Sequence, residues 1–250
     1  MNTKDNKSRV TKLRLLWRGV LLVIVLVFLV ITGMLAMTQK VPAAYSSYLP
    51  PVKTEQVSEY LTHYLMPNVH NNIQIDEPFE VVVPQEGINQ IIAEEDMLGW
   101  EWPVVLSKVT ISRPVVVFAP STIRLIGKVD IAGFDTVMTV CATPTVDREG
   151  MLRLNLQYVR AGSLDISFLA KKTIKRVIEG YLAEVQEQYW LRNILAACQD
   201  NEPFDPIFPA VDGKYIKLIK SKISDNKLVL IFEPSTRQEI ADTSKTDKGV

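Results

Sequence analysis

The longest apolar pattern in the chain runs from Gly19 to Met37 (GVLLVIVLVFLVITGMLAM) and contains no charged residue. Crossing the hydrocarbon core of a bilayer takes a helix of about 20 apolar residues, because backbone groups cannot bond to water there. Six of the first 18 residues are Lys or Arg, and only Asp5 is acidic. Since cations stay on the cytoplasmic side, the pattern predicts a cytoplasmic tail at 1–18, a transmembrane helix at 19–37 and an extracytoplasmic remainder.

A cleaved signal peptide is the alternative to an anchor. Signal peptides usually carry about 7–15 apolar residues, followed by a small-x-small cleavage site. The run here is longer, and neither its end at Ala36–Thr38 nor the pair Ala43 and Ala44 makes a good site. We therefore expect a retained, single-pass anchor in the plasma (inner) membrane. Residues 38–53 contain Pro50–Pro51 and are predicted to form a semi-extended stalk.

Beyond the stalk, the spacing of apolar residues first follows a helix. Val57, Tyr60, Leu61, Tyr64 and Leu65 share one helix face, and Pro67 is predicted to end that helix. The β-branched run Phe79–Val83 predicts a strand, and a helix of about three turns is predicted to begin at Pro84.

The middle of the chain then alternates with a period of two residues. This pattern predicts successive strands over 104–112, 114–118, 121–133, 134–142 and 151–159, with a turn at 147–150. Apolar residues fall on one side and polar residues on the other, which is typical of an antiparallel sheet with one wet face. A last hairpin is predicted over 214–222 and 227–232, with its turn at Asp225–Asn226.

An apolar sheet face needs a cover, and the segment from Phe168 to Cys198 is predicted to supply it as one long helix. The predicted fold class is therefore α+β. A coiled antiparallel sheet wraps on one long helix in a body spanning residues 54–234, preceded by the single transmembrane helix. The polar tail at 235–250 is predicted to be disordered.

Charge and cysteine content narrow the possible partners. The chain has 28 basic and 28 acidic residues, so that 22 and 27 remain after the first 18 residues. A mildly acidic body argues against binding to nucleic acid, which favours basic patches. Cys141 and Cys198 lie far apart in apolar stretches, so we expect buried free thiols; a disulfide is the alternative in this compartment.

The sequence contains no motif typical of hydrolases, zinc sites or nucleotide-binding loops. The two histidines, His63 and His70, lie near a predicted helix end without a matching acid or nucleophile. The acids Glu94, Glu95 and Asp96 lack the spacing of a calcium loop and fit a solvated helix end. We therefore expect no enzyme activity, no cofactor and no metal, although carboxylates brought together only by the fold would escape this test.

Two groups of residues could contact lipid. A basic cluster at the start of the predicted long helix follows Ser167, a plausible N-cap, and could hold a phosphate headgroup or simply form a solvated face. Trp100 and Trp102 could lie at a membrane interface or pack within their loop. The basic cluster consists of Lys171, Lys172, Lys175 and Arg176.

Several segments together resemble a known family. They are FEVVVPQEGINQII (79–92), RLIGKVDIAGF (124–134), TPTVDREGMLRL (143–154) and VRAGSLDIS (159–167). With the basic N-terminus and the anchor, this pattern resembles the YpmS-like membrane-anchored proteins of bacteria, a family without assigned activity. It is more distantly similar to the tubular (TULIP-type) lipid-binding domains. That resemblance implies an apolar tunnel between a long helix and a curved sheet.

The leading hypothesis is an anchored protein that binds a lipid or another hydrophobic ligand in an apolar groove. The alternative is a non-enzymatic structural or scaffolding subunit with a protein partner in the cell envelope. The same apolar residues would also make a filled core. The predicted groove lining is Ile123, Leu125, Val129, Ile131, Leu152, Leu154, Leu156, Ile178, Tyr181, Leu182 and Val185.

Overall fold

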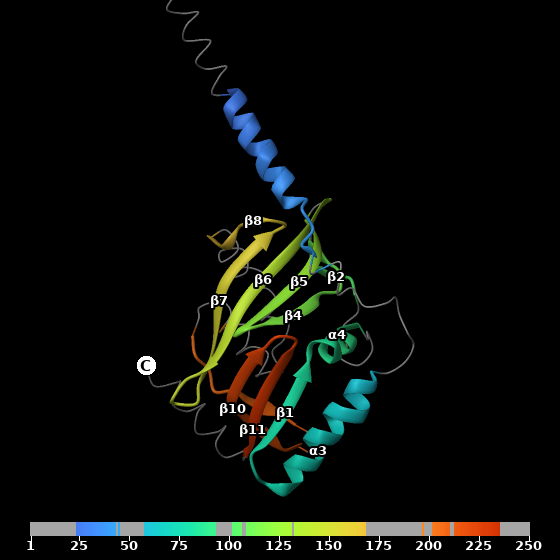
Figure 1. Cartoon of the computed structure of the whole chain (residues 1–250), viewed down its shortest axis with the longest axis vertical. Coiled ribbons are helices and arrows are strands. Elements are labelled where there is room, and N and C mark those ends of the chain that lie inside the picture. The colour runs from blue at the N-terminus through green and yellow to red at the C-terminus, as the bar shows by residue number, and fades with distance from the viewer. Residues whose placement is uncertain are drawn as a thin grey trace, which may run out of the picture.

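The computed structural model describes residues 24–43, 45, 58–93, 102–106, 109–131, 133–168, 197, 202–210 and 213–235. It confirms an α+β class with antiparallel sheets and few helices. An apolar helix stands at one end, a seven-stranded sheet follows, and a four-stranded sheet with helix α3 lies at the far end (Figure 1).

Residues 24–38 form the apolar helix, and every side chain from Ile24 to Met37 is exposed. Its only polar side chain before Thr38 is that of Thr32, whose hydroxyl donates to the Phe28 carbonyl at 2.8 Å. The described residues include no helix with both the length and the hydropathy needed to cross a membrane. Positions 19–23 of the predicted span lie outside the described residues.

The segment after the apolar helix is bonded to the tip of the seven-stranded sheet. The Met37 carbonyl accepts hydrogen bonds from the backbone and the hydroxyl of Ser163, at 2.9 and 3.1 Å. The Thr38 carbonyl accepts one from the Thr136 hydroxyl at 2.8 Å. The described part of the predicted stalk, 38–43 and 45, therefore includes residues fixed on the body.

The seven-stranded sheet contains the long strands that the period-two pattern predicts. Its order is β2-β3-β5-β6-β7-β8, and β4 also pairs with β5; all pairs are antiparallel. The single strand predicted over 104–112 is wrong, because β2 and β3 form two short paired strands there. The strands are β2 (Val104–Leu106), β3 (Val109–Ile111), β4 (Val115–Ala119), β5 (Thr122–Ile131), β6 (Phe134–Val146), β7 (Leu152–Ala161) and β8 (Leu164–Asp165).

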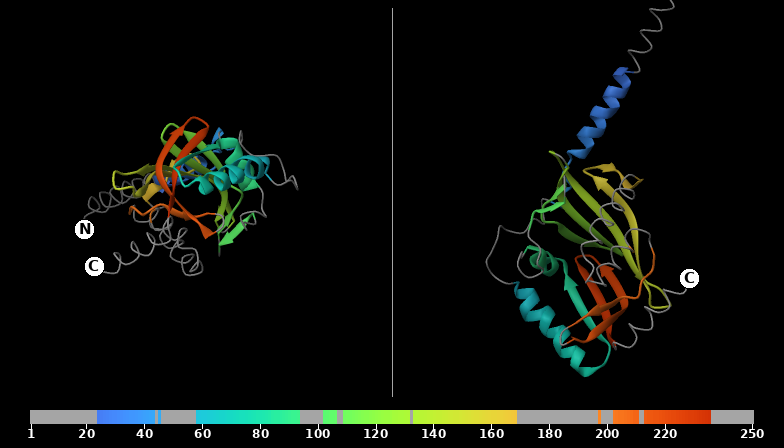
Figure 2. Two further views of the ribbon diagram at one scale, coloured as in Figure 1. Left: turned by 90° about the horizontal axis from the view of Figure 1, so that it is seen from below. Right: turned by 180° about the vertical axis from the view of Figure 1, so that it is seen from behind.

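The four-stranded sheet joins the first strand of the body to the last. Its order is β1-β11-β10-β9, so the predicted C-terminal hairpin pairs with the strand at Phe79 (Figure 2). The predicted turn at Asp225–Asn226 is confirmed, with Asn226 in the left-handed region at φ 63°. The strands are β1 (Phe79–Pro84), β9 (Ile207–Pro209), β10 (Tyr215–Ser224) and β11 (Lys227–Ser235).

A bulge between β6 and β7 changes which residues share a face. Ala142 pairs with Leu156 while the adjacent Cys141 pairs with Tyr158, so β7 holds one extra residue, Gln157. An extra residue reverses the alternation of side chains along a strand. The unbroken alternation predicted over 151–159 is therefore wrong at this point, because Leu156 and Tyr158 lie on opposite faces. Tyr158 lies opposite Cys141, which is a buried free thiol as predicted, while Cys198 lies outside the described residues.

The sheet face predicted to be wet is partly covered. Val115, Val117, Ile126 and Val137 form a buried cluster with Tyr45, which is only 9% exposed. Register places Ile126 on the same side as Arg124 and Lys128, because alternate residues of a strand share a face. The segment after the apolar helix thus contributes Tyr45 to the core.

The first helical stretch continues past Pro67, contrary to the prediction. Residues Tyr60–Leu65 form a π-helical segment, η1, which leads into α3 (Met66–Ile75). Pro67 lacks an N–H, but it occupies the first turn of α3, where the N–H needs no helical partner. The widened turn before it lets the chain stay helical. Of the long helix predicted from Phe168 to Cys198, only Phe168 and Ala197 lie within the described residues, and those residues contain no single long helix.

Helix α4 (Gln85–Ala93) connects the two sheets through buried amide side chains. Asn89 donates to the Val116 carbonyl at 2.8 Å and accepts from the Val116 N–H at 2.7 Å. Gln85 accepts from the Phe118 N–H at 2.8 Å. These amides satisfy backbone groups of β4, as a further strand would. Asn89 lies in the segment 79–92 that was quoted for the family resemblance, and its role there is therefore structural.

Candidate functional site

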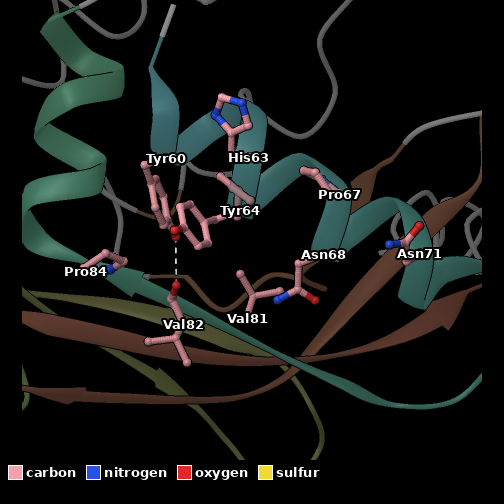
Figure 3. A pocket seen from close by; sticks show the side chains of 10 residues that line it. Tyr60, His63, Tyr64, Pro67, Asn68, Asn71, Val81, Val82 and Pro84 are labelled. Atoms are coloured by element: carbon pink, nitrogen blue, oxygen red, sulfur yellow. Dashed lines mark hydrogen bonds between the residues drawn. The ribbon is translucent and has the colours of Figure 1, made fainter.

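An open groove of about 610 Å³ lies between the η1–α3 helical stretch and the edge strand β1. Ligand pockets usually measure about 300–1,000 Å³ and are mostly apolar. Figure 3 shows the helical residues on one side and the strand on the other. The lining consists of Tyr60, His63, Tyr64, Leu65, Pro67, Asn68, Asn71, Val81, Val82 and Pro84.

Two tyrosine rings form one wall of the groove. Tyr60 and Tyr64 are stacked, with ring centroids 6.5 Å apart and ring planes 16° apart. The Tyr60 hydroxyl donates to the Val82 carbonyl at 2.8 Å, which fixes its ring across the groove (Figure 3). Burial raises the pKa of the Tyr60 hydroxyl above its usual 10.0, so it remains a donor at neutral pH. Apart from this stacking, the Tyr64 side chain is largely open to solvent, with an exposed fraction of 69%.

The position of the Tyr60 ring depends on Gly87 of α4. A methyl group added at Gly87 would lie 2.6 Å from two atoms of that ring. The absence of a side chain at this helical position thus lets the ring pack against α4. Val81, which is buried in the core cluster, also lines the groove.

The polar side-chain groups of the groove are two tyrosine hydroxyls, two amides and an imidazole. Asn68 also binds within α3, accepting from the Asn72 side chain through its backbone and side-chain oxygens. His63 is exposed, with Nδ1 3.3 Å from the Thr62 hydroxyl. None of the described lining residues is Asp, Glu, Lys or Arg. The groove therefore suits an uncharged, largely apolar ligand.

The predicted groove lining does not come together in one place among the described residues. Leu152 belongs to the core cluster under the four-stranded sheet, and Leu154 packs against it. Ile123 packs against a second cluster beside α4. Leu125 and Ile131 are 42% and 46% exposed, whereas Val129 is buried and Leu156 is half-buried. Four members, Ile178, Tyr181, Leu182 and Val185, lie outside the described residues.

The structure places only some of the other candidate residues from the sequence analysis. Trp102 packs against the cluster beside α4, and its indole donates to the Ile92 carbonyl at 3.1 Å. His63 and His70 lie at the end of the body away from the apolar helix (Figure 1). Within the described residues no group of three His, Cys, Asp or Glu side chains could hold a metal ion. The headgroup candidates Lys171, Lys172, Lys175 and Arg176 lie outside that part of the chain, as do Trp100 and the acids at 94–96.

The residues of this groove were missed as a site in the sequence. From the sequence alone, Tyr60 and Tyr64 are placed only on one face of a predicted helix. Their i, i+4 spacing places two rings together, and Asn68 and Asn71 continue the same stripe. That spacing is a usable signal. The groove itself also needs β1, which arrives through a pairing that the helix sequence does not encode.

No protein-family model matches this chain, and a search of curated proteins finds no similar sequence. The family resemblance therefore rests on the segments quoted above.

Proposed function

We propose that the chain is a single-pass membrane protein whose extracytoplasmic α+β body binds an uncharged hydrophobic ligand. The proposal of a membrane anchor is supported by the helix at 24–38, which is apolar on all sides and exposed on all sides. A helix without a polar face requires apolar surroundings, which a bilayer supplies. The basic residues before it favour an N-terminus in the cytoplasm.

The ligand site in this proposal is the groove of Tyr60 and Tyr64. Its volume, its stacked rings and its lack of charged lining residues favour a lipid chain or another apolar molecule. A ligand here would bind through buried apolar area, at about 25 cal/mol per Å² before ordering costs. The proposal includes no catalytic step and no cofactor. The same proposal includes the YpmS-like resemblance. It also includes the long helix predicted after Phe168, which would cover the exposed Leu125.

The anchor and the ligand are tested separately. Alkaline carbonate should leave the full chain in the membrane, and protease added outside should cleave the body. For the ligand, the chain is purified in detergent, extracted with organic solvent and analysed by mass spectrometry. Lipids that surround the apolar helix are a constant background. The comparison is therefore made between the parent, Tyr64→Arg in the groove and Ile75→Arg, an exposed position of α3 outside it.

We expect one extracted species to be retained in Ile75→Arg and lost in Tyr64→Arg. Both side chains are well exposed, so neither change should unfold the body. Leu125→Arg is extracted as a fourth sample, and a species lost only there would move the site to the sheet face of the predicted lining. Identical extracts from all the variants would refute ligand binding while leaving the anchor untouched.

A structural role in an envelope complex is the second candidate. It is favoured by the edge strand β2, where Val105 is 65% exposed. Unpaired strand edges are frequent docking sites for other chains. Cross-linking from position 105 in membranes would distinguish the two functions, because a stoichiometric protein partner without an extracted ligand supports only this one.

A further inference from the structure

The tip of the β5–β6 hairpin carries two exposed apolar side chains. Ile131 pairs directly with Phe134 across the turn, and directly opposite residues of an antiparallel pair point to the same face. Their exposed fractions are 46% and 38%. Gly133 forms the turn at φ +89°, and its N–H donates to the Asp130 carboxylate at 2.9 Å. Gly133, next to Phe134, is therefore bonded back to β5.

This tip lies beside the end of the apolar helix. Asp135 and Thr136, which follow Phe134, bind the chain where the helix ends. The Gln39 amide donates to the Asp135 carbonyl at 3.3 Å, and the Thr136 hydroxyl donates to the Thr38 carbonyl at 2.8 Å. The views from the front and from behind both show the β5–β6 turn level with that helix end (Figures 1 and 2).

The charged groups of the tip bind partners within the hairpin. Lys128 lies 2.7 Å from the Asp135 carboxylate, and Asp130 binds the turn. These residues alternate with Ile131 and Phe134 along their strands and so project from the opposite face. One face of the tip is thus apolar, and the other is polar and hydrogen-bonded within the hairpin.

We infer that Ile131 and Phe134 insert into the interfacial layer of the outer leaflet, so that the body rests on the lipid surface beside its own anchor. The inference rests on the proposed membrane anchor. Its occupant is lipid, because the apolar pair continues the exposed apolar surface of the helix, whose Met34 and Met37 are 46% and 44% exposed. Because Lys128, the cation of the tip, is paired with Asp135, insertion should not require anionic lipid or low salt.

The test uses the full chain in phosphatidylcholine nanodiscs whose acyl chains are brominated near the headgroup. Bromine quenches tryptophan at contact, so an added tryptophan reports on lipid. The probes are Phe134→Trp and, as a second variant at the same tip, Ile131→Trp. The control is Ile75→Trp, an exposed position at the far end of the body. Each spectrum is corrected by subtracting that of the parent, which has four tryptophans.

We expect the fluorescence added at 134 or 131 to be lost in brominated lipid and its emission to shift to the blue, while that added at 75 is unchanged. The loss should persist in high salt. Unquenched fluorescence at both tip positions, with carbonate-resistant anchoring, would overturn this inference alone. Equal quenching at 75 would also overturn it, because the contact would not be specific to the tip. Failure to stay in carbonate-washed membranes would overturn the anchor and this inference together.

Discussion

At the scale of single residues, the stability of the body depends on a few buried polar side chains. Each of them can reach its hydrogen-bond partners in only one position. Asn89 is 7% exposed and binds both backbone groups of Val116. The same amide in a solvated loop would contribute little. In a buried site its removal leaves two backbone groups without partners, and each such group costs about 1–3 kcal/mol. Neither the carbonyl nor the N–H of Val116 can turn to solvent, because Val116 is 8% exposed.

Asn89→Ala should therefore lower the free energy of unfolding by about 2–4 kcal/mol. The matched control is Gln90→Ala, at the neighbouring exposed position of α4, which should change it by less than about 0.5 kcal/mol. Urea titrations of the full chain in detergent measure both values. Equal effects of the two substitutions would mean that the Asn89–Val116 bonds contribute nothing beyond helix propensity.

Gly87→Ala tests the packing of the Tyr60 ring. In an exposed helix the change from Gly to Ala should stabilise by about 1 kcal/mol. Here the new methyl group meets the ring at 2.6 Å, so we expect destabilisation and weaker ligand retention in the groove. In a Tyr60→Ala background the clash is gone, and Gly87→Ala should become neutral or stabilising. This double-mutant cycle isolates the contact, and additive effects would disprove it.

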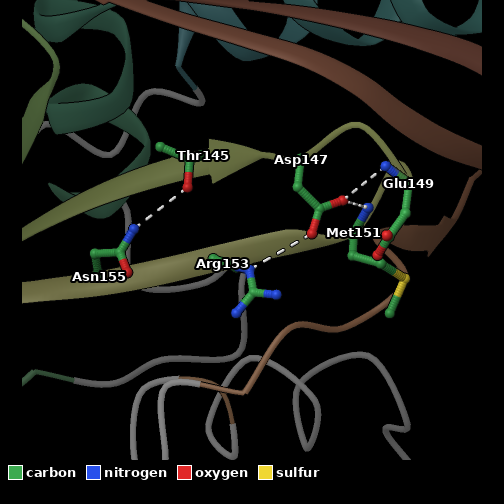
Figure 4. Close-up of polar contacts among 6 residues, drawn as sticks. All are labelled: Thr145, Asp147, Glu149, Met151, Arg153 and Asn155. Atoms are coloured by element: carbon green, nitrogen blue, oxygen red, sulfur yellow. Dashed lines mark hydrogen bonds and ion pairs between the residues drawn. The ribbon is translucent and has the colours of Figure 1, made fainter.

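At the scale of elements, the β6–β7 hairpin shows what the sequence can and cannot predict. The turn at Asp147–Gly150 follows from local chemistry, because the Asp147 carboxylate accepts from the Glu149 and Met151 N–H groups at 3.0 and 2.9 Å (Figure 4). The bulge at Gln157 does not follow from local chemistry. Leu156 and Tyr158 suggest one unbroken alternation, and only pairing with Ala142 and Cys141 reveals the extra residue.

This turn also predicts a pH dependence. The Met151 N–H, then the Glu149 N–H and Arg153, lower the pKa of the Asp147 carboxyl below its usual 3.8. A carboxylate with a depressed folded pKa stabilises the fold above the unfolded pKa, and that contribution is lost as pH falls through the folded pKa. The stability difference between the parent and Asp147→Asn should therefore narrow below about pH 3.8 and vanish in stronger acid.

The control for this prediction removes the positive charge beside Asp147 but keeps the backbone hydrogen bonds of the turn. Arg153→Ala deletes an ion pair of 3.5 Å and leaves both backbone hydrogen bonds to Asp147. Because the Met151 N–H is the largest cause of the shift, most of the pH dependence should remain in this variant. Acid titrations of unfolding by circular dichroism provide the comparison. An Arg153→Ala profile as flat as that of Asp147→Asn would assign the effect to the ion pair.

Pairings between distant strands explain the other differences from the sequence prediction. The hairpin turn at Asp225–Asn226 was predictable, but its partner was not, because β11 pairs with β1 about 150 residues earlier. The helix predicted to end at Pro67 instead continues, since a π-helical segment precedes the proline. In the same way the candidate groove could not be predicted, because it forms only where that continued helix meets β1.

At the scale of the whole molecule, the apolar helix and the sheet form one connected unit. A flexible stalk would let the body tumble relative to the membrane. Bonds from Ser163 and Thr136 to the last helical carbonyls, with Tyr45 buried in the sheet, oppose such motion. The candidate groove lies at the end of the body away from the helix (Figure 1). With the proposed anchor, it would face outward from the bilayer.

Gly162 is the residue on which this fixed attachment depends most. It adopts φ +58°, and a methyl group there would lie 2.4 Å from the Met37 carbonyl oxygen and 2.6 Å from that of Thr38. Neither contact can be relieved by a side-chain rotation, because both involve backbone. Gly162→Ala should therefore separate the helix end from the sheet. Lys40 is exposed in the parent, and release of its segment should speed trypsin cleavage there.

A strain of about 1.4 kcal/mol raises the population of the opened state tenfold, so cleavage after Lys40 should accelerate on the order of tenfold in nanodiscs. The control is Gly213→Ala, which also forces alanine to a positive φ, of 69°, but meets no atom within 4 Å. It carries the same backbone penalty without touching the junction. If both variants are cleaved at the parent's rate, the carbonyl contacts of Gly162 do not hold the helix. If only Gly162→Ala is cleaved faster, the contacts of Gly162 hold the end of the apolar helix on the sheet. The orientation of the groove relative to that helix then depends on this one glycine.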